Sequence, residues 1–185
     1  MADIFTIRMA LPAKNALDPD LIEWLSAELD AAASRPVLLT GTEGAFCAGL
    51  NLKRVAQLDA AGMEAFLRSF DALVQKLYLH PAPVVASVNG HAIAGGCVLA
   101  LACDHRVAAN EPRLRIGLNE IALGACFPPL TLRMVRHRLS PRVVETVLLG
   151  AGLHDPAAAR EMGLVDELSD EPESVALARL AALAR

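Results

Sequence analysis

An α/β fold is predicted by three features of this sequence. A buried-strand pattern followed by a glycine turn and a helical segment occurs twice, at VLLTG…CAG (37–49) and at VVASVNG…AGG (84–96). Repeated units of this kind are typical of a sheet with helical crossovers. The 185 residues are 54% hydrophobic and 21% charged, which is enough for one good-sized core. No low-complexity segment or Pro/Ser-rich linker interrupts residues 1–185, so we predict a single domain.

The first half of the chain alternates helical and strand patterns. Apolar residues recur at helical spacing in LIEWLSAELDAAAS (21–34), and Pro36 ends this helix before the buried strand PVLLTG (36–41). A glycine-rich turn then leads into helix-compatible residues, and a longer amphipathic helix spans 62–79. PAPVVASVNG (81–90) is the next predicted strand.

The second half begins with a segment, 96–103, that is apolar on every side and predicts a helix without a solvent face. LRIGLNEIALG (114–124) predicts a short strand and a loop. Two further predicted helices have an N-cap residue, a proline at the first helical position and a glycine after the end. These are Ser140, Pro141 and Gly150 in one helix, and Asp155, Pro156 and Gly163 in the other. A final amphipathic helix is predicted over 172–185.

Composition argues against several classes of protein. A net charge of −4 without a basic stripe predicts no nucleic-acid partner. The apolar runs are short and interrupted, and MADIFTIRMALP lacks the order of a signal peptide, so we expect no membrane partner and a cytoplasmic location. The motifs GxSxG, GxGxxG and GxxxxGK[ST] do not occur in the sequence.

The cysteines and histidines do not show metal-ligand spacing, so we predict no metal site. The four cysteines lie in apolar or glycine-rich segments and are expected to be reduced packing residues. They are Cys47, Cys97, Cys103 and Cys126.

Gly95 and Gly96 open the apolar helix and allow two interpretations. The start of a helix presents free backbone N–H groups, and a glycine there could let a ligand oxygen approach without meeting a Cβ. Two such turns could aim two amides at one point and form an oxyanion hole. Alternatively, the two glycines only permit tight packing between helix and strand.

Glu120 is the candidate acid. It is flanked by apolar residues in IGLNEIALG, where desolvation would raise its pKa toward the range that suits proton transfer. The competing interpretation is a structural cap of a loop or helix.

Three blocks in this order and separation resemble the crotonase, or enoyl-CoA hydratase/isomerase, superfamily. They are FCAGLNLKRV, NGHAIAGGCVLALACDHRVAA and GLNEIALG, and the similarity extends from about Pro12 to about Leu168. The resemblance implies a crotonase-like spiral of ββα units with helices packed around the sheets. It also implies an acyl-CoA thioester substrate, possibly a carrier-protein thioester, with coenzyme A as part of the substrate and no permanently bound cofactor.

The resemblance also implies roles for individual residues. The backbone N–H groups of Leu50 and Gly95 would form the oxyanion hole for the thioester carbonyl. The loop from Ala48 to Leu52 would contact the adenine and ribose of coenzyme A through its main chain, with Lys53 near the phosphates.

The residue type at position 98 distinguishes between the possible reactions. Hydratases of this family use two glutamates, and Val98 stands at the position of the first, whereas Glu120 matches the second. The motifs are most similar to the Δ3,Δ2-enoyl-CoA isomerase branch, so we expect isomerisation of a 3-enoyl-CoA with Glu120 as proton shuttle. The alternatives are a non-catalytic acyl-thioester-binding subunit, or hydration or decarboxylation at the same oxyanion hole.

The sequence departs from the family in three places. The N-terminal strands are abbreviated, Asn51 stands where an aspartate is common, and the helix over 172–185 takes the place of a longer C-terminal helical region. From the family we expect a homo-oligomer, a trimer or hexamer, with this final helix among its contacts.

Overall fold

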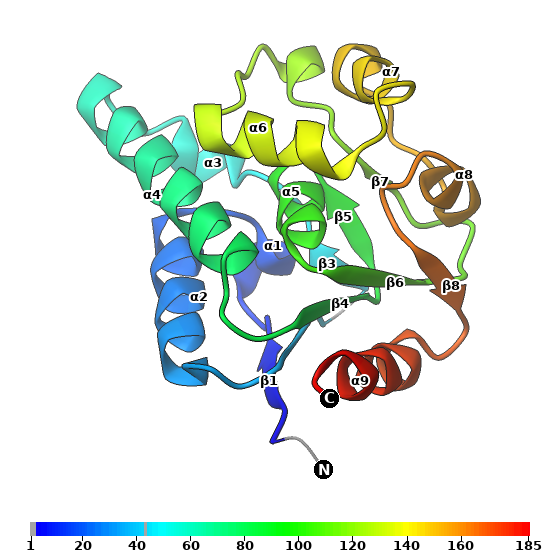
Figure 1. Ribbon diagram of the computed structural model, residues 1–185. Coiled ribbons are helices and arrows are strands. Elements are labelled where there is room, and N and C mark those ends of the chain that lie inside the picture. Colours follow the sequence, from blue (N-terminus) through cyan, green and yellow to red (C-terminus); the bar gives the residue numbers. More distant parts are fainter. Residues whose placement is uncertain (1–2, 43) are drawn as a thin grey trace.

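Two parallel sheets form the frame of the protein in this computed structural model, which describes residues 3–42 and 44–185 (Figure 1). The larger sheet has the strand order β1-β2-β4-β6-β8, and the smaller has the order β3-β5-β7. Their bounds are β1 (Phe5–Arg8), β2 (Val37–Thr40), β3 (Ala45–Cys47), β4 (Val84–Val88), β5 (His91–Ile93), β6 (His105–Ala109), β7 (Ile116–Gly117) and β8 (Glu167–Ser169).

The helices fill the connections between these strands, as the repeated strand–turn–helix pattern predicts. Their bounds are α1 (Pro12–Asn15), α2 (Pro19–Ala32), α3 (Leu52–Val55), α4 (Ala60–Tyr78), α5 (Gly95–Ala102), the 3₁₀ turn η1 (Ile121–Leu123), α6 (Pro129–Arg138), α7 (Val144–Gly150), α8 (Pro156–Glu161) and α9 (Pro172–Leu183). The helices predicted over 21–34, 62–79, 96–103 and 172–185 are confirmed to within three residues at either end.

The path of the chain is a spiral of ββα units. β2, β4 and β6 lie in the larger sheet, and the strand after each of them, β3, β5 and β7, lies in the smaller one. A helical segment follows each pair. The α/β expectation and the expected spiral with helices around the sheets are therefore confirmed.

The larger sheet is covered on both faces. On one face, Leu38 and Val85 pack with Ala176 and Leu180 of α9, which lies along the lower side of the sheet in Figure 1. Their neighbours in the strands, Val37, Leu39, Val84 and Ala86, pack into the main core on the other face. This alternation explains why β2 and β4 read as continuous apolar runs.

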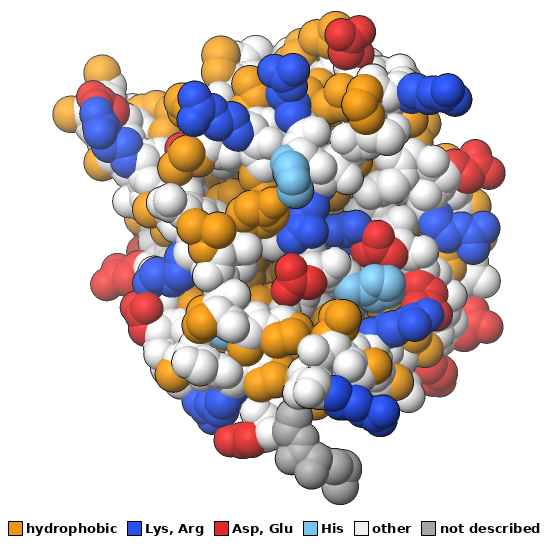
Figure 2. All heavy atoms as spheres, in the orientation of Figure 1, with side chains coloured by type: hydrophobic (Ala, Val, Ile, Leu, Met, Phe, Trp, Pro, Cys, Tyr) orange, Lys and Arg blue, Asp and Glu red, His pale blue; other side chains and the backbone are white. Residues whose placement is uncertain are grey.

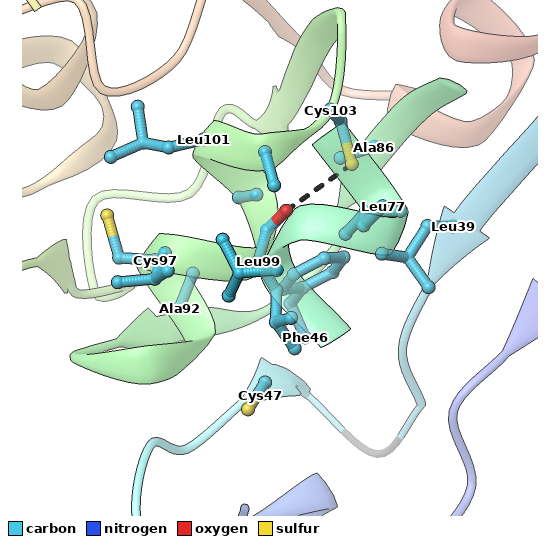
Figure 3. Packing of buried hydrophobic residues seen from close by; sticks show 14 of the residues in the cluster. Leu39, Phe46, Cys47, Leu77, Ala86, Ala92, Cys97, Leu99, Leu101 and Cys103 are labelled. Carbon is cyan, nitrogen blue, oxygen red and sulfur yellow. Dashed lines mark hydrogen bonds between the residues drawn. The ribbon is translucent and has the colours of Figure 1, made fainter. Parts of the chain in front are cut away.

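α5 lies in the middle of the main core (Figure 3). Every residue from Gly95 to Ala102 is buried, which confirms the prediction of a helix without a solvent face. In Figure 3, Leu99 lies among side chains from other elements, including Phe46 of β3 and Leu77 of α4, and its carbonyl accepts a hydrogen bond from the Cys103 thiol at 3.4 Å.

Of the two predicted helix caps, one is confirmed and the other is wrong. Asp155 Oδ1 accepts a hydrogen bond from the Ala158 N–H at 2.9 Å, as predicted for the start of α8. Ser140 was expected to cap α7 in the same way, but α7 begins at Val144 and carries no side-chain cap. Pro141 therefore lies before the helix, and Gly150 is its last residue and not the residue after it. The Ser140 carbonyl instead accepts from the N–H groups of Val143 and Val144, both at 3.1 Å, in a tight turn before the helix.

The prediction for the cysteines is wrong for one of the four. Cys47, Cys97 and Cys103 are free and buried, as expected, because they lie on β3 and α5 and next to α5, inside the core. Cys126 is free but exposed, because the apolar segment around it runs along the surface between η1 and α6.

Several elements were not predicted from sequence, among them the short strands β3, β5 and β8, the turn α1, the strand β6 and the helix α6. β6 carries His105 and Arg106, which read as surface residues in isolation. Arg106 is nevertheless buried, because its guanidinium donates to Asp166 Oδ1 at 2.5 Å and to the Cys103 carbonyl at 3.2 Å. Pairing with an acid 60 residues away thus offsets the burial of this charge.

Charged side chains of both signs are interspersed with apolar ones on the face shown in Figure 2. Ion pairs between charged side chains include Arg179 with Glu167 at 2.9 Å and Arg8 with Glu173 at 2.6 Å. Among the described residues, none of the helices is both long and apolar enough to span a bilayer.

Candidate active site

Three candidate residues follow the three strands of the smaller sheet. Leu50 comes three residues after β3, Gly95 two residues after β5, and Glu120 three residues after β7. The strands pair in parallel, β3 with β5 and β5 with β7, so their carboxyl ends meet at one edge of the sheet. Ligands commonly bind at such an edge in α/β folds. The spiral thus brings to one place residues that are far apart in sequence.

The loop that carries Leu50 is held by Leu17. The Leu17 N–H donates to the Gly49 carbonyl at 2.7 Å, and the Asn51 N–H donates to the Leu17 carbonyl at 2.8 Å. In a parallel bridge of this kind, the residue between the two bonded neighbours directs its own N–H to the opposite side. The Leu50 N–H therefore points away from Leu17.

The opposite side of this loop faces the start of α5. A Cβ placed on Gly49 would lie 2.7 Å from the Ile93 carbonyl oxygen and 3.3 Å from the Ala94 Cβ, and Gly49 has a φ of +83°. Only glycine fits this close approach and this backbone conformation. The loop of Leu50 and the residues just before Gly95 are thus in direct contact.

The backbone N–H groups of Leu50 and Gly95 are both free. Gly95 is the first residue of α5, where amides have no partner within the helix, and Ala94 before it has a non-helical conformation with φ 49° and ψ −122°. Neither amide donates a hydrogen bond to another residue in the part of the chain that the structure describes. Strained backbone of the kind seen at Ala94 is concentrated at functional sites.

The glycine pair itself is explained by packing. A Cβ on Gly95 would lie 2.2 Å from Leu17 Cδ1 and 3.3 Å from Phe70 Cζ, and a Cβ on Gly96 would lie 2.2 Å from the Cys47 carbonyl oxygen. Both missing Cβ atoms therefore point into the core. The interpretation that their absence admits a ligand oxygen is wrong, although the Gly95 amide remains available.

Glu120 is a buried carboxylate without a cap function. Its side chain is 7% exposed, and its Oε2 atom makes no hydrogen bond with any described residue. Desolvation raises its pKa to about 7, and a hydrogen bond from its own backbone N–H lowers the pKa by a smaller amount. The side chain caps no amide of η1, so the interpretation of Glu120 as a helix cap is wrong. A carboxyl group with this pKa exchanges protons readily near neutral pH.

Glu120 lies close to the first turn of α5. Burial raises the pKa of the Cys97 thiol, and the neighbouring Glu120 carboxylate raises it further. Val98, the next residue of α5, is fully buried. The β5–β7 pairing accounts for this proximity, because the Ala94 N–H donates to the Gly117 carbonyl at 2.8 Å.

Asn119 is a polar residue at this edge that the sequence analysis did not single out. Its Oδ1 atom is buried and lacks a hydrogen-bond partner among the described residues, as does Glu120 Oε2 beside it in sequence. The sequence signal was present, because Asn119 is the polar residue directly before Glu120 in the motif GLNE. An unpartnered buried oxygen is costly unless a ligand or water satisfies it.

The residues expected to contact coenzyme A lie on the outside of the loop. The Ala48 N–H is already bonded to the Lys14 carbonyl at 3.2 Å, which leaves the Ala48 carbonyl for a ligand. Leu52 is 56% exposed, and Lys53 is exposed on α3. The structure therefore leaves Leu52 and Lys53 accessible, and their contacts with a nucleotide stay a prediction.

An apolar cavity of about 880 Å³ lies between α4 and the segment after η1. Met63, Leu67 and Phe127 contribute to its wall, and Asp71 and Arg68 contribute charged groups. Leu50, Gly95 and Glu120 are not among the residues that line this cavity.

The fold places the protein in the crotonase class. A crystal structure of human mitochondrial delta3-delta2-enoyl-CoA isomerase superimposes with a TM-score of 0.91 at 30% identity, covering 97% of this chain and 72% of that one.

The chain belongs to the enoyl-CoA hydratase/isomerase family, whose model matches residues 1–185. It is 31% identical to human mitochondrial enoyl-CoA delta isomerase 1 over 97% of its own length and 62% of that protein. It is 35% identical to a putative enoyl-CoA hydratase of Thermus thermophilus over 92% of its length and 68% of the relative. The chain thus spans less than two thirds of the human isomerase, and its relatives include both isomerases and hydratases.

Proposed function

We propose that this protein isomerises a 3-enoyl-CoA to the conjugated 2-enoyl-CoA, with Glu120 as the only side chain that transfers protons. The proposal rests on one observation. The free amides of Leu50 and Gly95 and the buried carboxyl group of Glu120 lie at one edge of the smaller sheet, where the strands β3, β5 and β7 end. Val98, which is apolar and fully buried, stands where a second acid would be needed for hydration.

The chemistry follows from these groups. The Glu120 carboxylate removes a proton from C2 of the thioester, and the C–H electron pair moves into the C1–C2 bond. The resulting dienolate carries its charge on the thioester oxygen, where the Leu50 and Gly95 N–H groups donate hydrogen bonds. Glu120 then returns the proton to C4, which leaves the double bond between C2 and C3. The proton is conserved, and no second acid or base takes part.

The environment of Glu120 suits this double role. A group that first accepts and then donates the same proton works best with a pKa near the working pH. Desolvation raises the pKa of Glu120 to about 7, so both protonation states are accessible near neutrality. An exposed glutamate, with its lower pKa, would be a weaker base toward the C2 proton.

Hydration is disfavoured by the same arrangement. Addition of water needs one group to activate the water and another to protonate the carbon, and Val98 can do neither.

The test is a pair of spectrophotometric assays on the intact chain. One follows formation of the conjugated thioester from trans-3-hexenoyl-CoA, and the other follows loss of conjugation from crotonyl-CoA in water. We expect turnover in the first assay and at least a hundredfold slower turnover in the second. Faster hydration than isomerisation would contradict the proposal, and tight acyl-CoA binding without turnover in either assay would favour a non-catalytic binding subunit.

A further inference from the structure

We infer that Asn51 and Asp18 form a positioning pair that fixes the Leu50 amide. The inference rests on the proposed function, because it concerns the loop that would hold the thioester oxygen. Asn51 Nδ2 donates a hydrogen bond to Asp18 Oδ2 at 3.0 Å, across 33 residues of sequence. Both side chains belong to partly buried residues.

Asp18 is itself held rigidly. Its other carboxylate oxygen, Oδ1, accepts a hydrogen bond from the Leu21 N–H at 3.1 Å and so caps α2, a helix of 14 residues. One carboxylate therefore connects the first turn of a long helix to the loop of Leu50. The flanking residue Leu17 is fully buried, which anchors the same segment in the core.

The backbone and the side chain of Asn51 both bond to residues on the same side of this loop. The Asn51 N–H donates to the Leu17 carbonyl at 2.8 Å, while the Asn51 side chain donates to the adjacent residue, Asp18. Two hydrogen bonds to consecutive residues restrict rotation of the peptide units around Leu50. The direction of the Leu50 N–H is thereby set before any substrate binds.

The residue type at position 51 matters because of Asp18. An ionised carboxylate can only accept hydrogen bonds, and Asn supplies the donor that it needs. An aspartate at position 51 would place a second acceptor-only group about 3 Å from the first. Repulsion between the two carboxylates would then move the loop away from Leu17 and Asp18. The Leu50 N–H would move with it.

The test compares Asn51→Ala, Asn51→Asp and the exchanged pair Asp18→Asn/Asn51→Asp. In the exchanged pair, the amide introduced at position 18 can still cap Leu21 through its oxygen, and its NH₂ group can donate to the carboxylate introduced at position 51. We expect each Asn51 single variant to lower kcat by about tenfold with KM changed by less than about threefold, and the exchanged pair to recover most of the loss. Asp155→Asn, the same change at the cap of α8, controls for the exchange of Asp for Asn at a helix cap away from this loop and should leave kcat unchanged.

A second measurement separates this inference from the proposed function. Backbone hydrogen exchange at Leu17 and Asn51 reports loop anchoring whether or not the protein turns over a substrate. Faster exchange in Asn51→Ala, restored in the exchanged pair, supports the pair even if the wild-type protein does not isomerise 3-enoyl-CoA. Exchange that is unchanged in both single variants, or a loss of kcat that the exchanged pair does not recover, would overturn it.

Discussion

The carboxylate of Asp71 on α4 caps α6 through Thr131, which lies 60 residues further along the chain. Asp71 Oδ1 accepts from the Thr131 N–H at 2.7 Å and from its hydroxyl at 2.8 Å, and Oδ2 accepts from the Leu130 N–H at 3.2 Å. α6 begins with two prolines and has no capping side chain of its own. A residue of another helix thus satisfies the free amides of its first turn.

Asp71→Ala should therefore destabilise the protein. Loss of a helix cap costs about 1–2 kcal/mol, and here it also leaves the buried Thr131 hydroxyl without its partner. Asp71→Asn keeps one acceptor oxygen and should cost less. The measurement is the free energy of unfolding in urea for the three proteins, and equal values would show that α6 does not need this cap.

Glu120→Gln should abolish isomerisation without unfolding the protein. Gln is similar in size but cannot accept a proton at neutral pH, so we expect a loss of at least about 100-fold in kcat. Acyl-CoA binding should persist. Glu145→Gln, the same change at an exposed residue of α7, should leave the rate unaltered. A Glu120→Gln variant that keeps more than about a tenth of the wild-type rate would rule out the proposed proton shuttle.

The same substitution should change how stability depends on pH. The folded protein holds the Glu120 proton up to a pKa of about 7, whereas a glutamate in the unfolded chain loses it near 4.5. The stability contributed by that proton is complete below about pH 4.5 and is lost as the pH rises through 7, a change of about 3 kcal/mol. Glu120→Gln should thus be more stable than the wild type at pH 8, with the difference shrinking toward pH 5. Denaturation curves at both pH values check this, and a constant difference would contradict it.

Gly95→Ala should destabilise the protein through Leu17. The new Cβ would lie 2.2 Å from Leu17 Cδ1 in a fully packed region, and overpacking of this kind costs about 1–3 kcal/mol. Leu17→Ala removes the opposing atom at the expense of a cavity. In a double-mutant cycle, the two changes together should cost less than the sum of the separate costs. Additive costs would show that the two residues do not compete for the same space.

Ala13→Gly should stabilise the protein. Ala13, Lys14 and Asn15 all have φ between +56° and +59°, a left-handed turn that is unfavourable for residues with a Cβ. Ala13 is exposed, so glycine would relieve strain without loss of packing, and we expect a gain of about 0.5 kcal/mol. Ala65→Gly, at an exposed position inside α4, should instead cost about 1 kcal/mol. Thermal melts should show a higher melting temperature than the wild type for Ala13→Gly and a lower one for Ala65→Gly. A lower melting temperature for Ala13→Gly would contradict the prediction.

Features that depend on neighbours in the chain could be predicted from the sequence. The α8 start was predicted because Asp155 caps an amide three residues away, and a local hydrogen bond leaves a local signature. The strand–turn–helix units followed from apolar runs and glycines. The raised pKa of Glu120 was also predictable, because the segment IGLNEIALG around it is mostly apolar and such a segment rarely leaves a carboxylate solvated.

Features that depend on distant residues were decided only by the tertiary structure. α6 was not predicted because its cap comes from Asp71, and β6 was not predicted because the partner of Arg106 is Asp166. Glycine is needed at position 95 for packing, because Leu17 fills the space beside it. A hydrogen bond or a steric contact between residues tens of positions apart leaves no periodicity in the sequence. The meeting of Leu50, Gly95 and Glu120 at one sheet edge likewise exists only because the chain winds the ends of three parallel strands together.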